Sequence, residues 1–411
     1  MLSSNPWFWV ALVATIGLYK LELWAAFLNL SALSPTIPER LSHSINEEEH
    51  EQMLEYTRIS AKFDVIQSSV SLAFFLTFWW IGGFSVVDDR LRSLHLGDLQ
   101  TGLLTIAVVF FAQTLLSLPF EVYDTFFIEA QFGFNKTTVT TFIKDRIKGL
   151  MLAVVLGTPL LSLLLWLFQN VSYATAYGWV CVTTFSLLMS FLAPRLILPL
   201  FYKFKPLEEP SLREAIMKMG NRLQFPVGEI SIVDGSSRSS KANAFFTGFG
   251  RTKRIALFDT LLNNHTQDEI LAVLAHEIGH CKRRHVPKQL ILSLGTTAIM
   301  FALLQITLHD AGICAAFGVN APTIAWHLIF FSILYQPVSL LIGLLGSWLS
   351  RKYEFEADAF AREAMETPEP LASALIKLTR DHLGNPTPHP FYVFLNYSHP
   401  TTLQRLTALG A

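Results

Sequence analysis

Residues 149–168 read GLMLAVVLGTPLLSLLLWLF and contain no charged side chain. A helix of about 20 such residues crosses a hydrocarbon core about 30 Å thick and satisfies its own backbone hydrogen bonds there. Six further stretches have similar length and polarity: residues 6–28, 67–87, 99–119, 178–198, 289–309 and 325–349. One such stretch alone also fits a buried core helix. Seven together predict an α-helical integral membrane protein with seven transmembrane helices.

The composition of the 411-residue chain supports this class and argues against others. With 51% hydrophobic and 15% charged residues, the chain is too apolar for an ordinary soluble enzyme. Lys20 and Glu22 lie near the end of the first span, and no small-residue cleavage site follows, so we expect a retained span. The three cysteines have no CxxC spacing, and a net charge of −1 argues against a nucleic-acid partner.

The connecting segments differ in their content of Lys and Arg. Loops 29–66, 120–148 and 195–288 hold 3, 4 and 15 basic residues, and the C-terminal segment holds 6. The N-terminus and the second, fourth and sixth loops hold 0, 2, 0 and 0. Because cytoplasmic loops retain positive charge during insertion, the counts predict an outside N-terminus and a cytoplasmic C-terminus.

The fifth loop has the pattern of a small α/β domain. It predicts a helix near 210–223 and strands at 229–233 and 254–258. A further helix follows, since Thr266 and Glu269 form a capping-box pattern before apolar residues that recur at helical spacing.

This last helix contains His276-Glu277-Ile278-Gly279-His280, an H-E-x-x-H motif. Residues i and i+4 share one face of a helix, so the two imidazoles can hold one Zn²⁺ while Glu277 faces the water that the metal activates. The alternative is a pair of surface histidines on a solvated helix. The position of the motif, on a capped amphipathic helix directly before a span, favours the metal site.

A catalytic zinc needs a third protein ligand and an open position for water. The best candidate is Glu354, in the acidic segment after the last span, with Asp358 one turn later holding a ligand imidazole. Two predicted spans separate His280 from Glu354, and an even number of crossings returns the chain to the same side of the membrane. The alternative for this segment is a polar helix start after Arg351 and Lys352.

Several segments in which these residues lie resemble the CAAX prenyl protease 1 family, the seven-span zinc endopeptidases that trim prenylated proteins. The segments are Ser239 to Gly250, Arg254 to Leu262, His276 to His280, Glu354 to Asp358, and Tyr397 to Leu406. The resemblance covers nearly the whole chain. It implies an enzyme with one zinc ion per chain, acting on a peptide or protein substrate with a lipidated C-terminus, and helices ringed around an internal chamber.

The resemblance also implies individual roles. Zinc would be bound by His276, His280 and Glu354, and Glu277 would be the general base. Two further pairs are assigned to the substrate and the oxyanion: Asn243 and Ala244 would form an edge strand along which an extended substrate adds, and His399 and Arg405 would lie near the zinc and hold the oxyanion or the substrate carbonyl.

From these patterns we divide the chain into four segments. Residues 1–198 form membrane helices 1–5, residues 199–288 the cytoplasmic part of the metallopeptidase domain, residues 289–349 helices 6 and 7, and residues 350–411 the part that completes the zinc site. The lack of long hydrophilic insertions favours a bacterial source and its inner membrane; a eukaryotic chain would belong in the endoplasmic reticulum membrane.

Two details and two alternatives stay open. Cys281 stands where the family usually has an aromatic residue, and Lys282-Arg283-Arg284 either anchors the sixth span or contacts acidic lipid or substrate. One alternative function is a quality-control zinc protease for misfolded membrane proteins, a type that usually has fewer spans. The other is a transporter or channel with a regulatory zinc site, although no paired repeats are visible.

Overall fold

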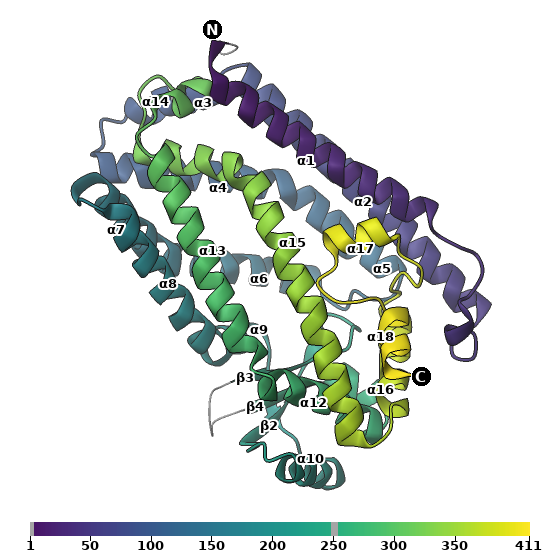
Figure 1. Cartoon of the computed structure of the whole chain (residues 1–411). Coiled ribbons are helices and arrows are strands. Elements are labelled where there is room, and N and C mark those ends of the chain that lie inside the picture. The colour runs from purple at the N-terminus through teal and green to yellow at the C-terminus, as the bar shows by residue number, and fades with distance from the viewer. Residues whose placement is uncertain (1–3, 248–253) are drawn as a thin grey trace.

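In the computed structural model, which describes residues 4–247 and 254–411, seven long apolar helical segments form the membrane part (Figure 1). Each overlaps one predicted span. Four are single helices: α1 (Pro6–Ser31), α2 (Glu47–Trp80), α13 (His285–Thr307) and α15 (Ile324–Met365). Three are runs of two helices joined by a π-helical turn: α4 (Asp98–Tyr123) with α5 (Glu129–Gln131), α6 (Val139–Leu152) with α7 (Thr158–Asn170), and α8 (Ala174–Leu192) with α9 (Leu198–Phe201).

The second segment differs most from its predicted range of 67–87. The helix starts twenty residues earlier, at Glu47, because Asn46 and Glu49 form a capping box there. It ends at Trp80, since Gly82 has a left-handed backbone with φ of 77° and redirects the chain into α3 (Gly83–Arg92). The short helix α14 (Ala311–Ala316) packs near α1 at the same end of the molecule.

The membrane helices bury little of their apolar surface against one another. In the most apolar window of each segment, between 0% and 17% of the residues are buried. A helix packed along one side buries roughly a third of its residues. Gln113 and Gln336 are exposed, and Gln305 accepts a hydrogen bond from the Thr175 hydroxyl. These features agree with the predicted ring of helices around an internal chamber.

At one end of the ring lies a four-stranded sheet in the order β1 (Phe204–Pro206), β2 (Glu229–Val233), β4 (Arg254–Phe258) and β3 (Ala244–Thr247). Strands β2 and β4 are parallel, and the other pairs are antiparallel. Helix α10 (Pro210–Arg222) precedes β2, so the helix and both strands predicted for the fifth loop are confirmed. Strand β3 lies at the edge of the sheet. Gly248, Phe249 and Gly250, part of the family-like segment, fall outside the described residues.

Helical layers connect the sheet to the membrane part. The short α11 (Asp259–Asn264) leads into α12 (Gln267–Lys282), whose predicted capping box of Thr266 and Glu269 is present. Apolar residues of α12 pack into one core with the sheet and the end of α15, and the partly buried Cys281 packs against it. Three C-terminal helices complete this half: α16 (Glu369–Asp381), α17 (Pro390–Asn396) and α18 (Thr402–Leu409).

Candidate metal centre

The two helices that carry the predicted metal ligands, α12 and α15, are in direct contact. Gly279, within the H-E-x-x-H motif, makes the contact close. A Cβ atom at this position would lie 3.1 Å from the Cα of Ala357, tighter than nearly all real Cβ contacts. Only glycine allows the backbones to approach this far without a shift, which brings the histidines of α12 beside Glu354 of α15.

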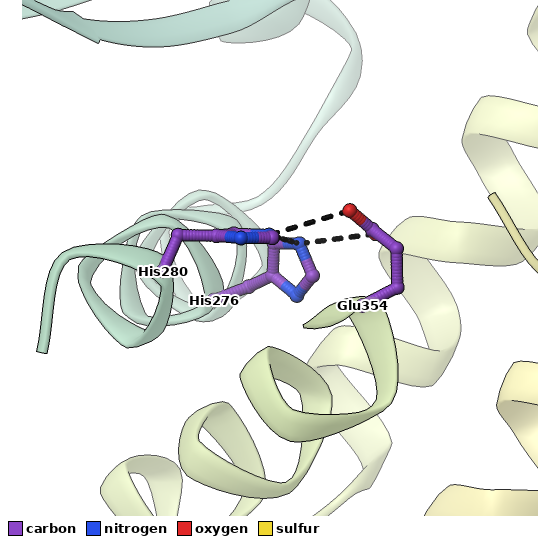
Figure 2. Close-up of side chains that lie close together, drawn as sticks. All are labelled: His276, His280 and Glu354. Atoms are coloured by element: carbon purple, nitrogen blue, oxygen red, sulfur yellow. Dashed lines mark hydrogen bonds and ion pairs between the residues drawn. The ribbon is translucent and has the colours of Figure 1, made fainter. Parts of the chain in front are cut away.

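Figure 2 shows His276 and His280 turned toward Glu354. The Nε2 atoms of the two histidines are 3.1 Å apart, and the Glu354 carboxylate oxygens lie 3.4 Å from Nε2 of His276 and 3.3 Å from Nε2 of His280. Four ligands held at about 2.0–2.1 Å in a tetrahedron are about 3.3 Å from one another. The spacing of these three donor atoms therefore fits one tetrahedral metal ion, and two histidines with a glutamate form a known donor set for catalytic zinc.

The electrostatics of the site also suit a cation. Burial lowers the pKa of His276, but hydrogen bonds to Asp358 and Glu354 outweigh burial and raise the pKa to about 9. Positive charge between these donor atoms is thus stabilised by the surrounding carboxylates.

Asp358, one turn after Glu354, contacts His276 on the side of the ring away from the predicted metal position. Its Oδ1 atom lies 2.8 Å from Nδ1 of His276, which leaves Nε2 for the metal. Asp358 in turn accepts two hydrogen bonds from Arg405, at 2.8 Å and 2.6 Å. The Arg405 guanidinium also lies 3.5 Å from Glu354 and is only 12% exposed. Arg405 therefore braces Glu354 and Asp358, and its side chain also lines the cleft that opens beside them.

His285 and Glu356 complete the site, and the sequence analysis missed both. His280 is connected through its Nδ1 atom to Nδ1 of His285 at 3.0 Å, and Nε2 of His285 lies 3.0 Å from the Glu356 carboxylate. His285 is buried and stacks on Tyr353 with ring centres 4.3 Å apart. The only local signal was a histidine directly before a span, because the contact with Glu356 bridges 71 residues of sequence.

A cleft of about 640 Å³ opens beside the ligands and is lined by Glu277, Asn243, Ala244 and His399. Desolvation raises the pKa of the half-buried Glu277, although the imidazoles of His276 and His280 lower it. A carboxylate with a raised pKa is a better proton acceptor near neutral pH. The structure thus places the predicted base and the predicted substrate residues in one cleft.

His399 lies at the mouth of this cleft. Its Nε2 atom is 3.5 Å from Glu354, and its side chain is 63% exposed, so it can turn toward a bound peptide. The hydroxyl of Ser398 lies 2.9 Å from its Nδ1 atom.

The substrate residues Asn243 and Ala244 are held by the sheet. The carbonyl of Asn243 accepts a hydrogen bond from Phe258, and Ala244 starts β3 and pairs with Leu257. Because β3 is the edge strand, its other side is free of sheet partners among the described strands. Just before it, the ammonium group of Lys241 lies 3.1–3.2 Å from both carboxylate oxygens of Glu129, at the end of a membrane helix.

Both the membrane part and the metallopeptidase part of the chain match known protein families. Residues 27–203 match the family model described as CAAX prenyl protease N-terminal, five membrane helices, and residues 206–411 match peptidase family M48. The CAAX prenyl protease 1 homolog of Oryza sativa subsp. japonica is 34% identical, over 98% of this chain and 97% of its own length. CAAX prenyl protease 1 of Saccharomyces cerevisiae is 33% identical, over 98% and 95%.

One solved structure is also similar to this chain. The crystal structure of S. mikatae Ste24p has a TM-score of 0.91 and 33% sequence identity, and the match covers 98% of this chain and 99% of that chain. Membrane ring, sheet and metallopeptidase half thus share one arrangement with this relative. The chain belongs to the CAAX prenyl protease 1 family of integral membrane zinc metalloendopeptidases.

Proposed function

We propose that this chain hydrolyses a peptide bond near the C-terminus of prenylated CAAX-type proteins. The observation that carries the proposal is the cleft in which an edge strand, a metal-ligand set and a general base meet. The relatives named for CAAX processing match the chain over nearly its full length, which supports the choice of substrate.

His276, His280 and Glu354 would hold one zinc ion per chain. When bound, zinc polarises the scissile carbonyl and lowers the pKa of water toward about 7. Asp358 and His285 keep Nδ1 of the two histidines engaged, so both present Nε2 to the ion.

Glu277 supplies the proton transfers. It removes a proton from the attacking water and delivers it to the leaving amine, for which its raised pKa is suited. His399, exposed at the cleft mouth beside Glu354, donates a hydrogen bond to the developing oxyanion. Arg405, which binds Asp358 and lines the cleft, would also help to hold the substrate carbonyl.

The substrate binds as an added strand. Asn243 and Ala244 lie at the start of the edge strand β3 and line the cleft, so an extended peptide would pair with the free side of β3 and place its scissile bond over the predicted metal ligands. The side-chain oxygen of Asn243 accepts a hydrogen bond from the Ala244 amide and stiffens the entry to the strand.

We also propose an orientation in the membrane and a type of membrane. The distribution of Lys and Arg supports an N-terminus outside and a catalytic half in the cytoplasm. The bilayer would be a bacterial inner membrane, or the endoplasmic reticulum membrane for a eukaryotic chain. We also propose the four-segment division, whose boundary between 349 and 350 lies inside the continuous helix α15.

The test is cleavage of a farnesylated CAAX peptide by detergent-purified protein, with metal content measured in parallel. Wild type should contain zinc and cut the peptide, whereas Glu277→Ala should contain zinc and cut nothing. Asp268→Asn, at an exposed position of the same helix, is the control and should behave as wild type. Cleavage of unmodified proteins in place of this peptide, still dependent on Glu277, would support quality control. Zinc binding without any turnover would contradict the peptidase assignment.

A further inference from the structure

A second cavity lies between α15 and α18, on a different set of side chains from the catalytic cleft. It has a volume of about 700 Å³, and we call it the α15–α18 groove. Helix α15 contributes Trp348, Arg351 and Lys352, and α18 contributes Gln404 and Ala408. Figure 1 shows α18 beside the lower part of α15. The charged residues that line the groove, Arg351 and Lys352, are both basic.

These basic groups retain capacity for an anion. Lys352 is 59% exposed, and its ammonium group is 3.9 Å from the nearest carboxylate oxygen, of Glu356, too far for a good hydrogen bond. Arg351 uses one Nη1 donor on the backbone carbonyl of Tyr397. A guanidinium has five N–H donors, so the remaining ones can face an anionic group in the groove.

An apolar stripe leads along α15 to this basic pair. Leu341, Leu345 and Trp348 follow at helical spacing and are 68%, 49% and 55% exposed. Four residues later the same face presents Lys352. A span that places exposed leucines in the hydrocarbon, a tryptophan next and then a lysine matches the order of layers from acyl chains to headgroups.

From this juxtaposition we propose that the α15–α18 groove binds the headgroup of an anionic glycerophospholipid, with one acyl chain along Leu341, Leu345 and Trp348. The phosphate pairs with Arg351 and Lys352. A lipid with net negative charge is favoured over a zwitterionic one because both charged side chains that line the groove are basic, and basic residues near a membrane surface attract anionic headgroups.

The groove joins the two helices that brace the metal centre. Helix α15 carries Glu354 and Asp358, and α18 carries Arg405, which binds Asp358. Tyr397, bound by Arg351, lies two residues before His399. A lipid that spans both helices therefore stabilises their packing, and bound anionic lipid raises the thermal unfolding temperature.

The test is native mass spectrometry of the detergent-purified full chain, titrated with phosphatidylglycerol and with phosphatidylcholine of identical acyl chains. Wild type should bind phosphatidylglycerol more tightly. Lys352→Gln should raise its Kd about fivefold, equivalent to about 1 kcal/mol. Ala408→Trp should also weaken binding because the indole fills the groove from an exposed position without changing any charge. Lys218→Gln, at an exposed position of α10, is the control of matched charge and should bind as wild type.

Equal binding of the two lipids would overturn the proposal, as would unchanged binding by both Lys352→Gln and Ala408→Trp. Displacement of phosphatidylglycerol by equimolar inorganic phosphate would assign the groove to a soluble anion instead. Both readouts, lipid mass and unfolding temperature, are independent of peptidase activity.

Discussion

Nδ1 of His285 lies 3.0 Å from Nδ1 of His280, and this contact determines the tautomers of two histidines at once. With Nε2 of His280 directed at the metal position, its proton is on Nδ1 and is donated to Nδ1 of His285. The proton of His285 is then on Nε2 and is donated to Glu356, 3.0 Å away. Glu356 and His285 thus orient one predicted ligand, while Asp358, which Arg405 binds, orients the other.

Substituting His285 should therefore weaken zinc binding. His285→Phe keeps a ring to stack on Tyr353 but removes the acceptor for His280, and outer-shell losses of this kind typically cost 10–100-fold in metal affinity. Competition with a chromogenic chelator measures the effect without substrate. Glu356→Gln should give a smaller loss because its carboxamide oxygen still accepts the proton of His285. Wild-type zinc affinity in His285→Phe would show that the contact is only packing.

Arg405 should matter for stability as well as for activity. Arg405→Met leaves the buried carboxylate of Asp358 without its two-point partner, and breaking a buried pair on one side costs about 3–5 kcal/mol. Arg405→Lys retains the charge but not the paired geometry, so its stability should lie between that of wild type and that of Arg405→Met. Thermal unfolding in detergent measures both variants, with the exposed Arg213→Met on α10 as control. A decrease in the unfolding temperature no larger than the control's would contradict this.

The ion pair of Lys241 and Glu129 should position the substrate strand. Lys241→Met frees the segment that precedes Asn243, so KM for a CAAX peptide should rise more than kcat falls. The exposed Lys205→Met is the control. If the pair acts as a unit, the double variant with Lys241→Met and Glu129→Gln should lose less kcat/KM than the two single losses combined. Expressed as a free energy, the coupling between the two residues should be about 0.5–3 kcal/mol. Strict additivity would mean that the two residues act separately.

Acid should destabilise the segment that precedes Asn243, because His382 binds this segment and becomes protonated. Nε2 of His382 accepts a hydrogen bond from the Ala242 amide at 3.1 Å, and burial, with Lys241 nearby, lowers the pKa of His382 below its usual 6.5. The unfolded chain then binds the proton more readily than the folded one. Stability from His382 is therefore complete above about pH 6.5 and is lost as the pH falls below it.

His382→Gln keeps an acceptor oxygen for Ala242 but does not titrate. Its unfolding temperature should fall less than that of wild type between pH 7.5 and 5.5, and the difference between the two proteins isolates His382 from the other histidines. His43→Gln removes an exposed histidine and should follow wild type. Parallel curves for His382→Gln and wild type would exclude this role.

Much of the architecture was readable in the sequence because its causes are local. A run of about 20 apolar residues is needed to cross the bilayer whatever else the chain does, so seven such runs predicted seven spans. The capping box of Thr266 and Glu269 predicted where α12 starts, and helical spacing alone placed His276 and His280 on one face.

Other features depended on neighbours that the sequence does not display. The acidic segment of Glu354 was compatible with a polar helix start, but it continues the last span as one helix of 42 residues. The length of α2 also exceeded its apolar run, because polar residues from Glu47 onward extend the helix beyond the hydrocarbon core.

By itself, the sequence determined the class of protein, the number of spans and the chemistry of the motif, because hydrophobic length and helical periodicity act within one segment. The sequence offered Glu354 as the best third ligand, but only the tertiary structure decided how the distant groups contact one another: Glu354 with the histidines, Arg405 with Asp358, and Glu356 with His285. Those contacts depend on how closely α12 and α15 pack, which Gly279 permits and no pattern along the chain reports.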